Sequence, residues 1–384
     1  MRNDRIAFYL LLVLLPVQCI DPYEPEWKDS ENLLVIEGTI TNAPGPYTVK
    51  ISTTPGLESS LQKPLEGASV VLSEQGGTQE FLEEIAPGTY STSVAGIQGV
   101  VGHSYKISVT TPDGQAYESS YETILPPEPI DTVYAVVESR SDPKYAYDLQ
   151  GYQFYLETTI QNEGNAYFLW KLTETYKLNS DLLIPYYYAG HIYPFPDPDS
   201  LFTCYKTTEI QDILAFDASR LEIPRIQGYP LRYVDTEGRD LYLRYSLLTR
   251  QYSISKEAYV FWNNIQKQNT GFGALYTTQP FQIRGNMVNI QDPGEAVLGY
   301  FMAAGYTEKR IFVDPPSGVA FHFSICTIGD FEIQYMQTLP RTWPSRWPIY
   351  LSTSPEGILG VPAPICVDCR LRGASLERPD FWVD

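Results

Sequence analysis

The fold class is decided by two short stretches, YTVKIST at residues 47–53 and SYKISVTT at residues 104–111. In the first, Tyr47, Val49 and Ile51 alternate with polar residues, and the second repeats this pattern of period two. Successive side chains of a β-strand point to opposite faces, so the alternation predicts strands with one buried and one solvated face. The chain is therefore expected to be mainly β.

Four further stretches between residues 32 and 125 have the composition of short strands separated by turns. Turn signals lie at residues 42–46 (NAPGP) and 112–114 (PDG), where proline, aspartate and glycine favour the dihedral angles of turns. Six strands at this spacing predict a small β-sandwich over residues 32–125. The four stretches are LLVIEGTI (33–40), ASVVLSE (68–74), GTYSTSV (88–94) and AYESSYETI (116–124).

The order of these strands resembles the prealbumin-like or Ig-like sandwich that recurs in envelope proteins. The resemblance is carried by VIEG at residues 35–38, GASV at residues 67–70 and GTY at residues 88–90. It implies a spacer or docking module. The segment LPPEPID at residues 125–131 then ends the domain, because three prolines within four positions make a stiff, extended linker.

Residues 130–384 are expected to form a larger β-rich domain with one or few short helices. Strand signals recur there, for example QFYLETTI at residues 153–160 and AYFLWKLTETY at residues 166–176. A helix is predicted near residues 256–268, with Ser255 as its N-cap and Gly271 just beyond its end. Its apolar residues form one stripe, which predicts packing against the core. They are Ala258, Phe261, Trp262 and Ile265.

The N-terminus has the pattern of an exported protein. Two arginines precede an apolar run at residues 6–17, which suits a signal peptide and is shorter than the roughly 20 residues of a membrane-spanning helix. Cys19 follows, and a cysteine at this place resembles the bacterial lipoprotein signal, so residues 1–18 are predicted to be removed and Cys19 to carry lipid. Gln18 and Pro16 depart from the usual signal. The alternative is ordinary cleavage nearby, with Cys19 as a spare thiol.

Acidic residues dominate both the segment after Cys19 and the chain as a whole. Residues 19–31 are acidic and rich in proline, which predicts a stiff tether. An acidic stretch at this place resembles the signal that sends Bacteroidetes lipoproteins to the outer face of the outer membrane; a plain solvated linker is the alternative. With 27 basic and 46 acidic residues, the net charge of −19 repels nucleic acid. No nucleic-acid partner is expected, and membrane contact is expected through the lipid.

The chain contains five cysteines, of which four remain if Cys19 carries lipid. An even number in an oxidising compartment favours disulfides. The short spacing of Cys366 and Cys369 favours a bond between them, which leaves Cys204 to pair with Cys326. A redox-active pair, a zinc site and free thiols are the alternatives, although a structural zinc site needs four ligands and the chain has only three histidines.

Motifs of known hydrolases and nucleotide-binding enzymes are absent from the sequence. It contains no His-Glu-x-x-His, no Gly-x-Ser-x-Gly, no phosphate-binding glycine-rich loop and no dinucleotide fingerprint. Asp197, Asp199 and Asp292 are conceivable calcium ligands, but their surroundings are typical of turns. The sequence therefore predicts no enzymatic activity, no cofactor and no metal site, although a catalytic pair of carboxylates is recognisable only from distances.

One long segment without periodicity, YYYAGHIYPFPDP at residues 186–198, is the candidate binding loop. Long loops in compact domains often carry function, and exposed tyrosines contact sugar rings or protein partners. The alternative is a loop that folds back on its own aromatic side chains. The candidate residues are Tyr186, Tyr187, Tyr188, His191, Tyr193 and Phe195.

The second half of the chain contains a series of short motifs that resembles one family. In order they are YSL (245–247), YSIS (252–255), VLGYF (297–301), CVDCR (366–370) and RPDFW (378–382). This order is similar to that of the Bacteroidetes lipoprotein family catalogued as domain of unknown function 4249. The resemblance implies a surface-exposed outer-membrane lipoprotein that assists a TonB-dependent transporter in nutrient capture. A structural or adhesive surface module and a surface glycan or peptide hydrolase are the alternatives.

Overall fold

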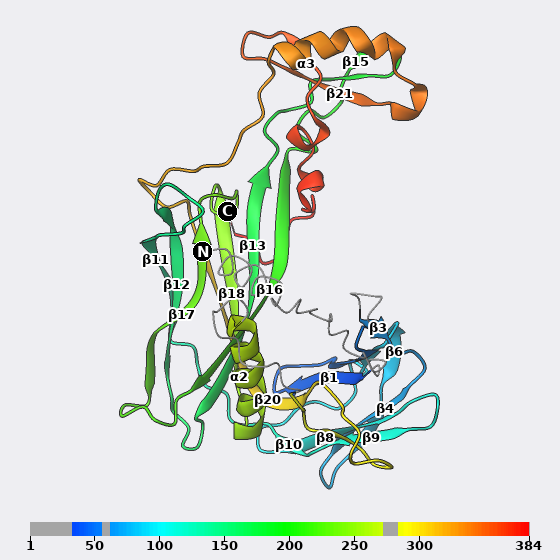
Figure 1. Cartoon of the computed structure of the whole chain (residues 1–384), viewed down its shortest axis with the longest axis vertical. Coiled ribbons are helices and arrows are strands. Elements are labelled where there is room, and N and C mark those ends of the chain that lie inside the picture. The colour runs from blue at the N-terminus through cyan, green and yellow to red at the C-terminus, as the bar shows by residue number, and fades with distance from the viewer. Residues whose placement is uncertain (1–32, 56–61, 272–282, 384) are drawn as a thin grey trace, which may run out of the picture.

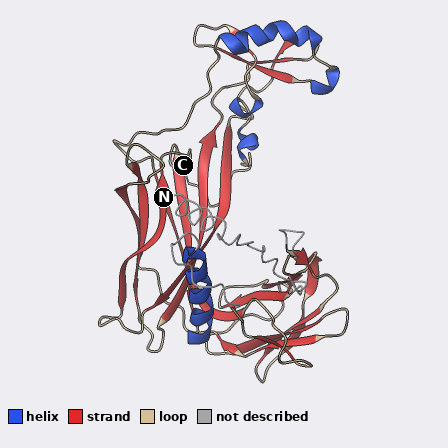
Figure 2. Ribbon diagram, viewed as in Figure 1, coloured by secondary structure: helices blue, strands red, loops and turns tan. Residues whose placement is uncertain are grey.

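The computed structural model describes residues 33–55, 62–271 and 283–383. The predicted signal peptide, Cys19 and the tether lie outside these residues. Strands dominate the described part (Figure 2), which confirms the mainly β fold class. The molecule is elongated, with a sandwich at one end, two packed sheets in the middle and a small lobe at the other end (Figure 1). Among the described residues, no helix is both long and apolar enough to cross a membrane.

The sandwich at one end consists of two sheets that share one hydrophobic core. The alternating residues of the sequence pattern, among them Val49, Ile51 and Ile107, are buried in this core, which confirms the predicted sandwich. The strands of one sheet are β1 (Leu34–Thr41), β2 (Thr48–Thr53), β3 (Lys63–Pro64), β6 (Glu83–Ala86) and β7 (Thr89–Ser91). Those of the other are β4 (Ser69–Glu74), β5 (Gln79–Phe81), β8 (Ser104–Thr110), β9 (Ala116–Ser119), β10 (Glu122–Thr123) and β19 (Met287–Asn289).

The middle of the molecule contains a second pair of packed sheets. Large side chains such as Phe154, Trp170 and Tyr245 are fully buried between them. One is continuous with the first sheet of the sandwich, so that the two form a single nine-stranded sheet. Its own strands are β13 (Tyr167–Asn179), β16 (Thr203–Asp217), β18 (Arg244–Ser253) and β20 (Phe301–Val313). The other contains β11 (Thr132–Arg140), β12 (Leu149–Thr159) and β17 (Arg225–Asp235).

Strand β20 belongs both to the sandwich and to the central sheet. Its residues 301–304 pair in parallel with β1 of the sandwich, and its residues 305–313 pair antiparallel with β18 of the central sheet. The short strand β19 likewise joins the sandwich, because it pairs with β9. Strands that lie more than 160 residues after residue 125 therefore complete a sandwich that the sequence analysis placed within residues 32–125.

Helix α2 (Lys256–Gly271) packs on the central sheet. Its predicted N-cap is confirmed, since the hydroxyl oxygen of Ser255 accepts a hydrogen bond from the backbone N–H of Ala258 at 3.1 Å. Ala258 and Phe261 are buried, and the ring of Phe261 lies 5.0 Å from that of Tyr300. The apolar stripe thus packs in the core. Gly271 was expected beyond the helix but is its last residue, because the C-terminal boundary of a helix is poorly defined by local sequence.

The far end of the molecule forms a small lobe on top of the long strands β13 and β16 (Figure 1). We call residues 183–201 and 327–363 the distal lobe, and residues 180–182, 324–326 and 364–372 the neck. The lobe contains β14 (Tyr186–Tyr188), β15 (Ile192–Pro194), β21 (Ile349–Thr353), β22 (Leu359–Gly360), α3 (Asp330–Tyr335), and the 3-10 helices η1 (Met336–Arg341) and η2 (Pro344–Arg346). The neck contains the 3-10 helices η3 (Pro364–Cys366) and η4 (Cys369–Arg372).

Candidate functional site

Two disulfides close the neck, Cys204–Cys369 and Cys326–Cys366. All four cysteines are oxidised as expected, but the predicted pairing of Cys366 with Cys369, and of Cys204 with Cys326, is wrong. Cys366 ends η3 and Cys369 begins η4, so each belongs to a different turn and meets a different partner. Short spacing favours contact in an unfolded chain, whereas the folded backbone decides which sulfur atoms come within bonding distance.

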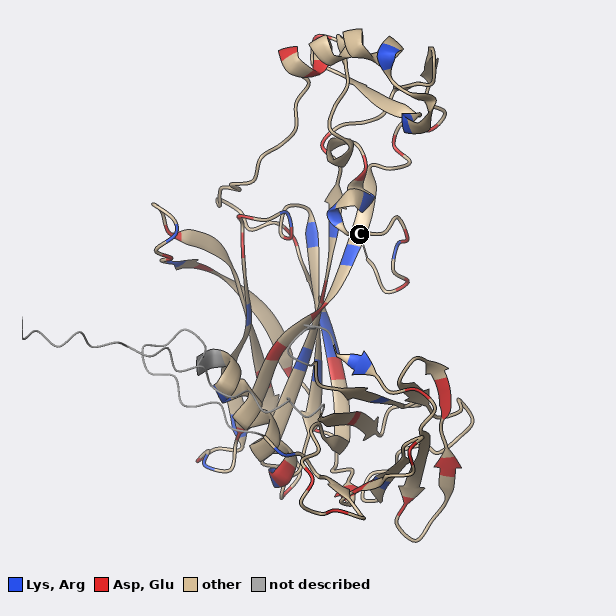
Figure 3. Ribbon diagram, turned by 45° about the vertical axis from the view of Figure 1, so that its right-hand side comes forward, with Lys and Arg blue, Asp and Glu red and all other residues tan. Residues whose placement is uncertain are grey.

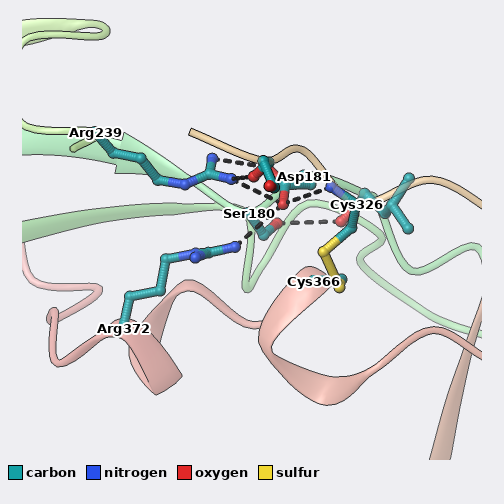
Figure 4. Close-up of polar contacts among 8 residues, drawn as sticks. Ser180, Asp181, Arg239, Cys326, Cys366 and Arg372 are labelled. Carbon is teal, nitrogen blue, oxygen red and sulfur yellow. Dashed lines mark hydrogen bonds and ion pairs between the residues drawn. A yellow bond between two sulfur atoms is a disulfide. The ribbon is translucent and has the colours of Figure 1, made fainter. Parts of the chain in front are cut away.

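A buried carboxylate, that of Asp181, joins the segments of the neck (Figure 4). It lies 2.7 Å from the Nη1 atom of Arg239 and 3.1 Å from the Nη2 atom of Arg372. It also accepts a hydrogen bond from the backbone N–H of Cys326 at 3.1 Å. Burial, and then the adjacent Arg239, lower the pKa of Arg372. Because the two guanidinium groups and the amide share one carboxylate, the neck holds the distal lobe firmly on the central sheets.

The candidate binding loop is a hairpin in which most aromatic side chains contact one another. The ring of Tyr187 stacks on Tyr193 with centroids 5.5 Å apart, and Phe195 meets Tyr350 edge to face at 5.4 Å. Tyr188 is buried against Trp347. The alternative of a loop folded on its own aromatics is therefore closest to what is found. Of the six candidate residues, Tyr186, His191 and Tyr193 are exposed.

A cavity of about 460 Å³ lies between α3, β21 and the start of η3. Aromatic, proline and aliphatic side chains together form most of its wall, and Glu332, Thr342 and Arg346 supply the polar groups. Such a mixture of many apolar groups and few polar ones is typical of sites that bind small molecules or peptide segments. The apolar lining residues are Phe331, Tyr335, Pro348, Ile349, Tyr350, Val361, Pro362, Ala363, Pro364 and Val367.

Large apolar side chains are also exposed on the outside of the distal lobe. Phe331 at the edge of the cavity is 73% exposed, and Trp343 in the following turn is 76% exposed. Ile192 and Tyr193 on the hairpin and Ile358 before β22 add further exposed apolar surface. Exposed aromatic side chains on one small unit are typical of surfaces that contact a partner, whereas single exposed apolar residues need no explanation.

Most of this surface lies outside residues 186–198, the segment predicted from the sequence as a binding loop, and only Ile192 and Tyr193 belong to both. A signal was present in WPSRWP at residues 343–348, where two tryptophans alternate with prolines. Tryptophan is rare on surfaces without a partner, and proline holds it in an extended backbone. The contribution of Phe331 had no comparable signal, since only the fold brings α3 beside β21.

The acidic residues considered as calcium ligands behave as turn residues. Asp292 accepts a hydrogen bond from the backbone N–H of Gly294 at 3.0 Å. A hydrogen bond with Asp199 raises the pKa of Asp197 in the turn after the hairpin. Within the described ranges, no three histidine, cysteine, aspartate or glutamate side chains are grouped closely enough to hold a metal ion.

A comparison with known protein families found a match that covers most of this chain. The family model described as "Domain of unknown function (DUF4249)" matches residues 20–310, which is more than half of the sequence. The chain belongs to the DUF4249 family. The match spans the sandwich, α2 and most of β20, whereas the C-terminal motifs at residues 366–370 and 378–382 lie beyond it. The family description assigns no enzymatic activity. No curated protein matches the chain.

Proposed function

We propose that this DUF4249 protein is a non-enzymatic accessory lipoprotein that docks on a TonB-dependent transporter of the outer membrane through its distal lobe. Lipid on Cys19 would hold it at the membrane, with the described body on the extracellular side. The observation that carries the proposal is the exposed aromatic surface of a lobe that two disulfides and a buried ion-pair network hold in place.

The physics of binding favours a surface of this kind as a docking site. A few aromatic residues supply most of the free energy of a protein interface. A surface that is already rigid loses little conformational entropy on binding, so more of that free energy remains as affinity. The neck supplies this rigidity, and Phe331 and Trp343 supply the aromatic groups.

The disulfides also support placement outside the cytoplasm. Disulfides persist in oxidising compartments and are rare among cytosolic proteins. Both bonds join segments distant in sequence, with separations of 165 and 40 residues. Export through the predicted signal peptide is therefore consistent with the chemistry of the neck.

Co-purification from native membranes tests the docking. The tagged protein, extracted gently, is expected to recover a TonB-dependent transporter. Phe331→Ser removes an aromatic anchor, which costs about 2 kcal/mol and lowers affinity about 30-fold, so recovery of the transporter should drop strongly. Phe81→Ser is the matched control, because Phe81 lies in the sandwich and is 74% exposed, as against 73% for Phe331.

Three outcomes would count against the proposal. Recovery of the protein alone would favour a structural or adhesive module. An equal drop in transporter recovery with Phe331→Ser and Phe81→Ser would show that the distal lobe has no special role in docking. For the anchor, Cys19→Ser should release the protein from membranes, and retention without a change in processing would contradict lipidation.

A further inference from the structure

A second cavity, of about 440 Å³, lies at the bend where the sandwich meets the central sheet and α2 covers its edge. Unlike the cavity of the distal lobe, it carries many charged and amide side chains. Figure 3 shows Lys and Arg in blue along the central strands, although the chain as a whole is acidic. The polar and aromatic lining residues are Glu37, Trp170, Lys171, Glu209, Gln211, Asp212, Arg250, Trp262 and Asn269, and the carboxylate of Asp212 lies 3.6 Å from Arg232.

A break in the strand pairing places Lys171 at this cavity. In the ladder between β13 and β16, Trp170 pairs with Leu214 and Leu172 pairs with Ile210. Lys171 of β13 is therefore opposite three residues of β16, 211–213, where a regular ladder would have one. Bulges of this kind are frequent next to binding sites, because they redirect side chains and free backbone groups from the ladder. Since β16 is the outermost strand, the freed groups face no further strand of its sheet.

Two cations lie side by side in the cavity. Arg250 on β18 is the direct cross-strand neighbour of Lys171, and its Nη1 atom donates to the hydroxyl of Thr173 at 2.7 Å. None of the ion pairs found among the described residues includes Lys171 or Arg250. Lys171 is an exposed residue, yet partial loss of hydration lowers its pKa, against the opposing effect of Glu37 and Glu209. An anion bound next to Lys171 and Arg250 would be stabilised by their two positive charges.

Aromatic rings flank the same lysine. Its Nζ atom lies 5.4 Å from the ring of Trp262 on α2 and 5.8 Å from that of Tyr252 on β18. The indole N–H of Trp262 is buried and has no hydrogen-bond partner among the described residues. Most buried donors are paired, and this one is among seven buried side-chain atoms of the described residues that are not. A ligand with both a flat apolar face and hydrogen-bonding groups would match these features.

We propose that this cavity binds a carboxylated sugar residue of an acidic polysaccharide. Lys171 and Arg250 take the carboxylate through charge-assisted hydrogen bonds, and Trp262 takes the apolar face of the ring. Glu37, Glu209 and Gln211 bind hydroxyl groups, which a fatty acid would lack. The volume lies within the range of about 300–1,000 Å³ that is usual for small-molecule sites. The cavity is outside the distal lobe, so binding here and docking there can fail independently.

Calorimetric titration of the intact, disulfide-bonded protein tests the site. The probes are oligogalacturonate and oligomannuronate, with neutral galacto-oligosaccharide for comparison. At least one acidic oligomer should bind saturably, and Lys171→Met should weaken its binding at least tenfold. Lys63→Met removes the same charge from an exposed position on β3 and should leave binding unchanged. Absence of binding by both acidic oligomers, equal binding of the neutral oligomer, or full binding by Lys171→Met would overturn the proposal.

A second measurement needs no variant and so does not depend on how the substitution affects folding. Trace acetylation followed by mass spectrometry reports how accessible each lysine is. The acidic oligomer should lower the acetylation of Lys171 at least fivefold and leave Lys63 unchanged. Equal acetylation of Lys171 with and without the oligomer would overturn the assignment of the carboxylate to this residue.

Discussion

At the scale of single residues, Asp181 links several segments at the neck. Its side chain is 3% exposed, and it bonds with groups from three other segments of the chain. A buried charge is tolerated only when partners compensate for its lost hydration. The two arginines and the backbone amide supply that compensation, and each would lose its partner if the charge were removed.

Replacing Asp181 by Asn should lower the free energy of unfolding by about 3–5 kcal/mol, because it leaves buried cationic groups without their counter-charge. Urea unfolding with the disulfides intact measures the loss. Asp314→Asn is the control, since this carboxylate is 77% exposed and lies 3.3 Å from Arg244. A surface pair of this kind contributes less than about 1 kcal/mol. Equal losses in both variants would contradict the role given to Asp181.

Glu122 is a second buried carboxyl group, and it predicts a dependence on pH. It accepts hydrogen bonds from the hydroxyls of Tyr300 and Ser255, and burial raises its pKa. Below the ordinary pKa of glutamate, Glu122 is protonated in both the folded and the unfolded state. In that range it does not make the free energy of unfolding depend on pH. As pH rises through the window between the ordinary and the raised pKa, the unfolded state releases the proton first and the folded state loses stability.

Glu122→Gln should therefore gain stability relative to the wild type as pH rises from 4 to 7. The amide keeps the size of the side chain and cannot ionise. The difference in free energy of unfolding between the two proteins, measured at both pH values, checks this. A difference that stays constant, or that changes in the opposite direction, would show that Glu122 is not the group responsible.

At the scale of elements, the approach of residues 297–304 to β1 joins the sandwich to the rest of the chain. The backbone N–H of Ile36 donates to the carbonyl of Leu298 at 2.9 Å. Gly299 has a φ of +87°, and a methyl group there would overlap the carbonyl oxygen of Ile36. Only glycine fits this position, because a side chain meets both an unfavourable backbone conformation and a neighbouring strand.

Gly299→Ala should destabilise the protein by about 3 kcal/mol, the sum of roughly 1 kcal/mol for the left-handed conformation and about 2 kcal/mol for the overlap. Gly318→Ala is matched to it, with a φ of +77° and no heavy atom within 4 Å of the added methyl group. It should cost about 1 kcal/mol. Thermal unfolding of the two variants compares them, and similar losses would mean that the close approach to β1 is unimportant.

At the scale of the whole molecule, the sandwich and the central sheets depend on one another. Met287, Val297, Phe301 and Ala303 are buried in the sandwich core, although they follow the whole of α2 in the chain. A sandwich without them has an incomplete core, and β1 pairs only with β2 and has one unpaired edge. The two parts are therefore expected to unfold together.

A fragment of residues 33–125 should fail to fold, because it lacks the side chains of β19 and β20. NMR spectra with little dispersion and unfolding without a sharp transition are expected. Joining residues 283–304 to the fragment by a flexible linker should restore a cooperative transition. A stable, well-dispersed spectrum from residues 33–125 alone would show that the later strands are dispensable.

Local sequence determined the features that depend on neighbouring residues. The alternation of Tyr47, Val49 and Ile51 with polar residues predicted a strand in which every second side chain is buried. Ser255 marked the start of α2. These features follow from the period of a strand and from the unpaired N–H groups at the start of a helix, both of which act within a few residues. The mainly β class and the family resemblance were accessible for the same reason.

Only the tertiary structure decided which distant segments meet. Cys369 pairs with Cys204 across 165 residues, β20 joins β1, and Lys171 lies beside Trp262 at the bend. No local period carries this information, because such contacts depend on the path of the whole chain and on the burial that many segments achieve together. The candidate sites consist of contacts of this kind, which is why the sequence predicted only the hairpin part of the exposed surface and none of the charged cavity.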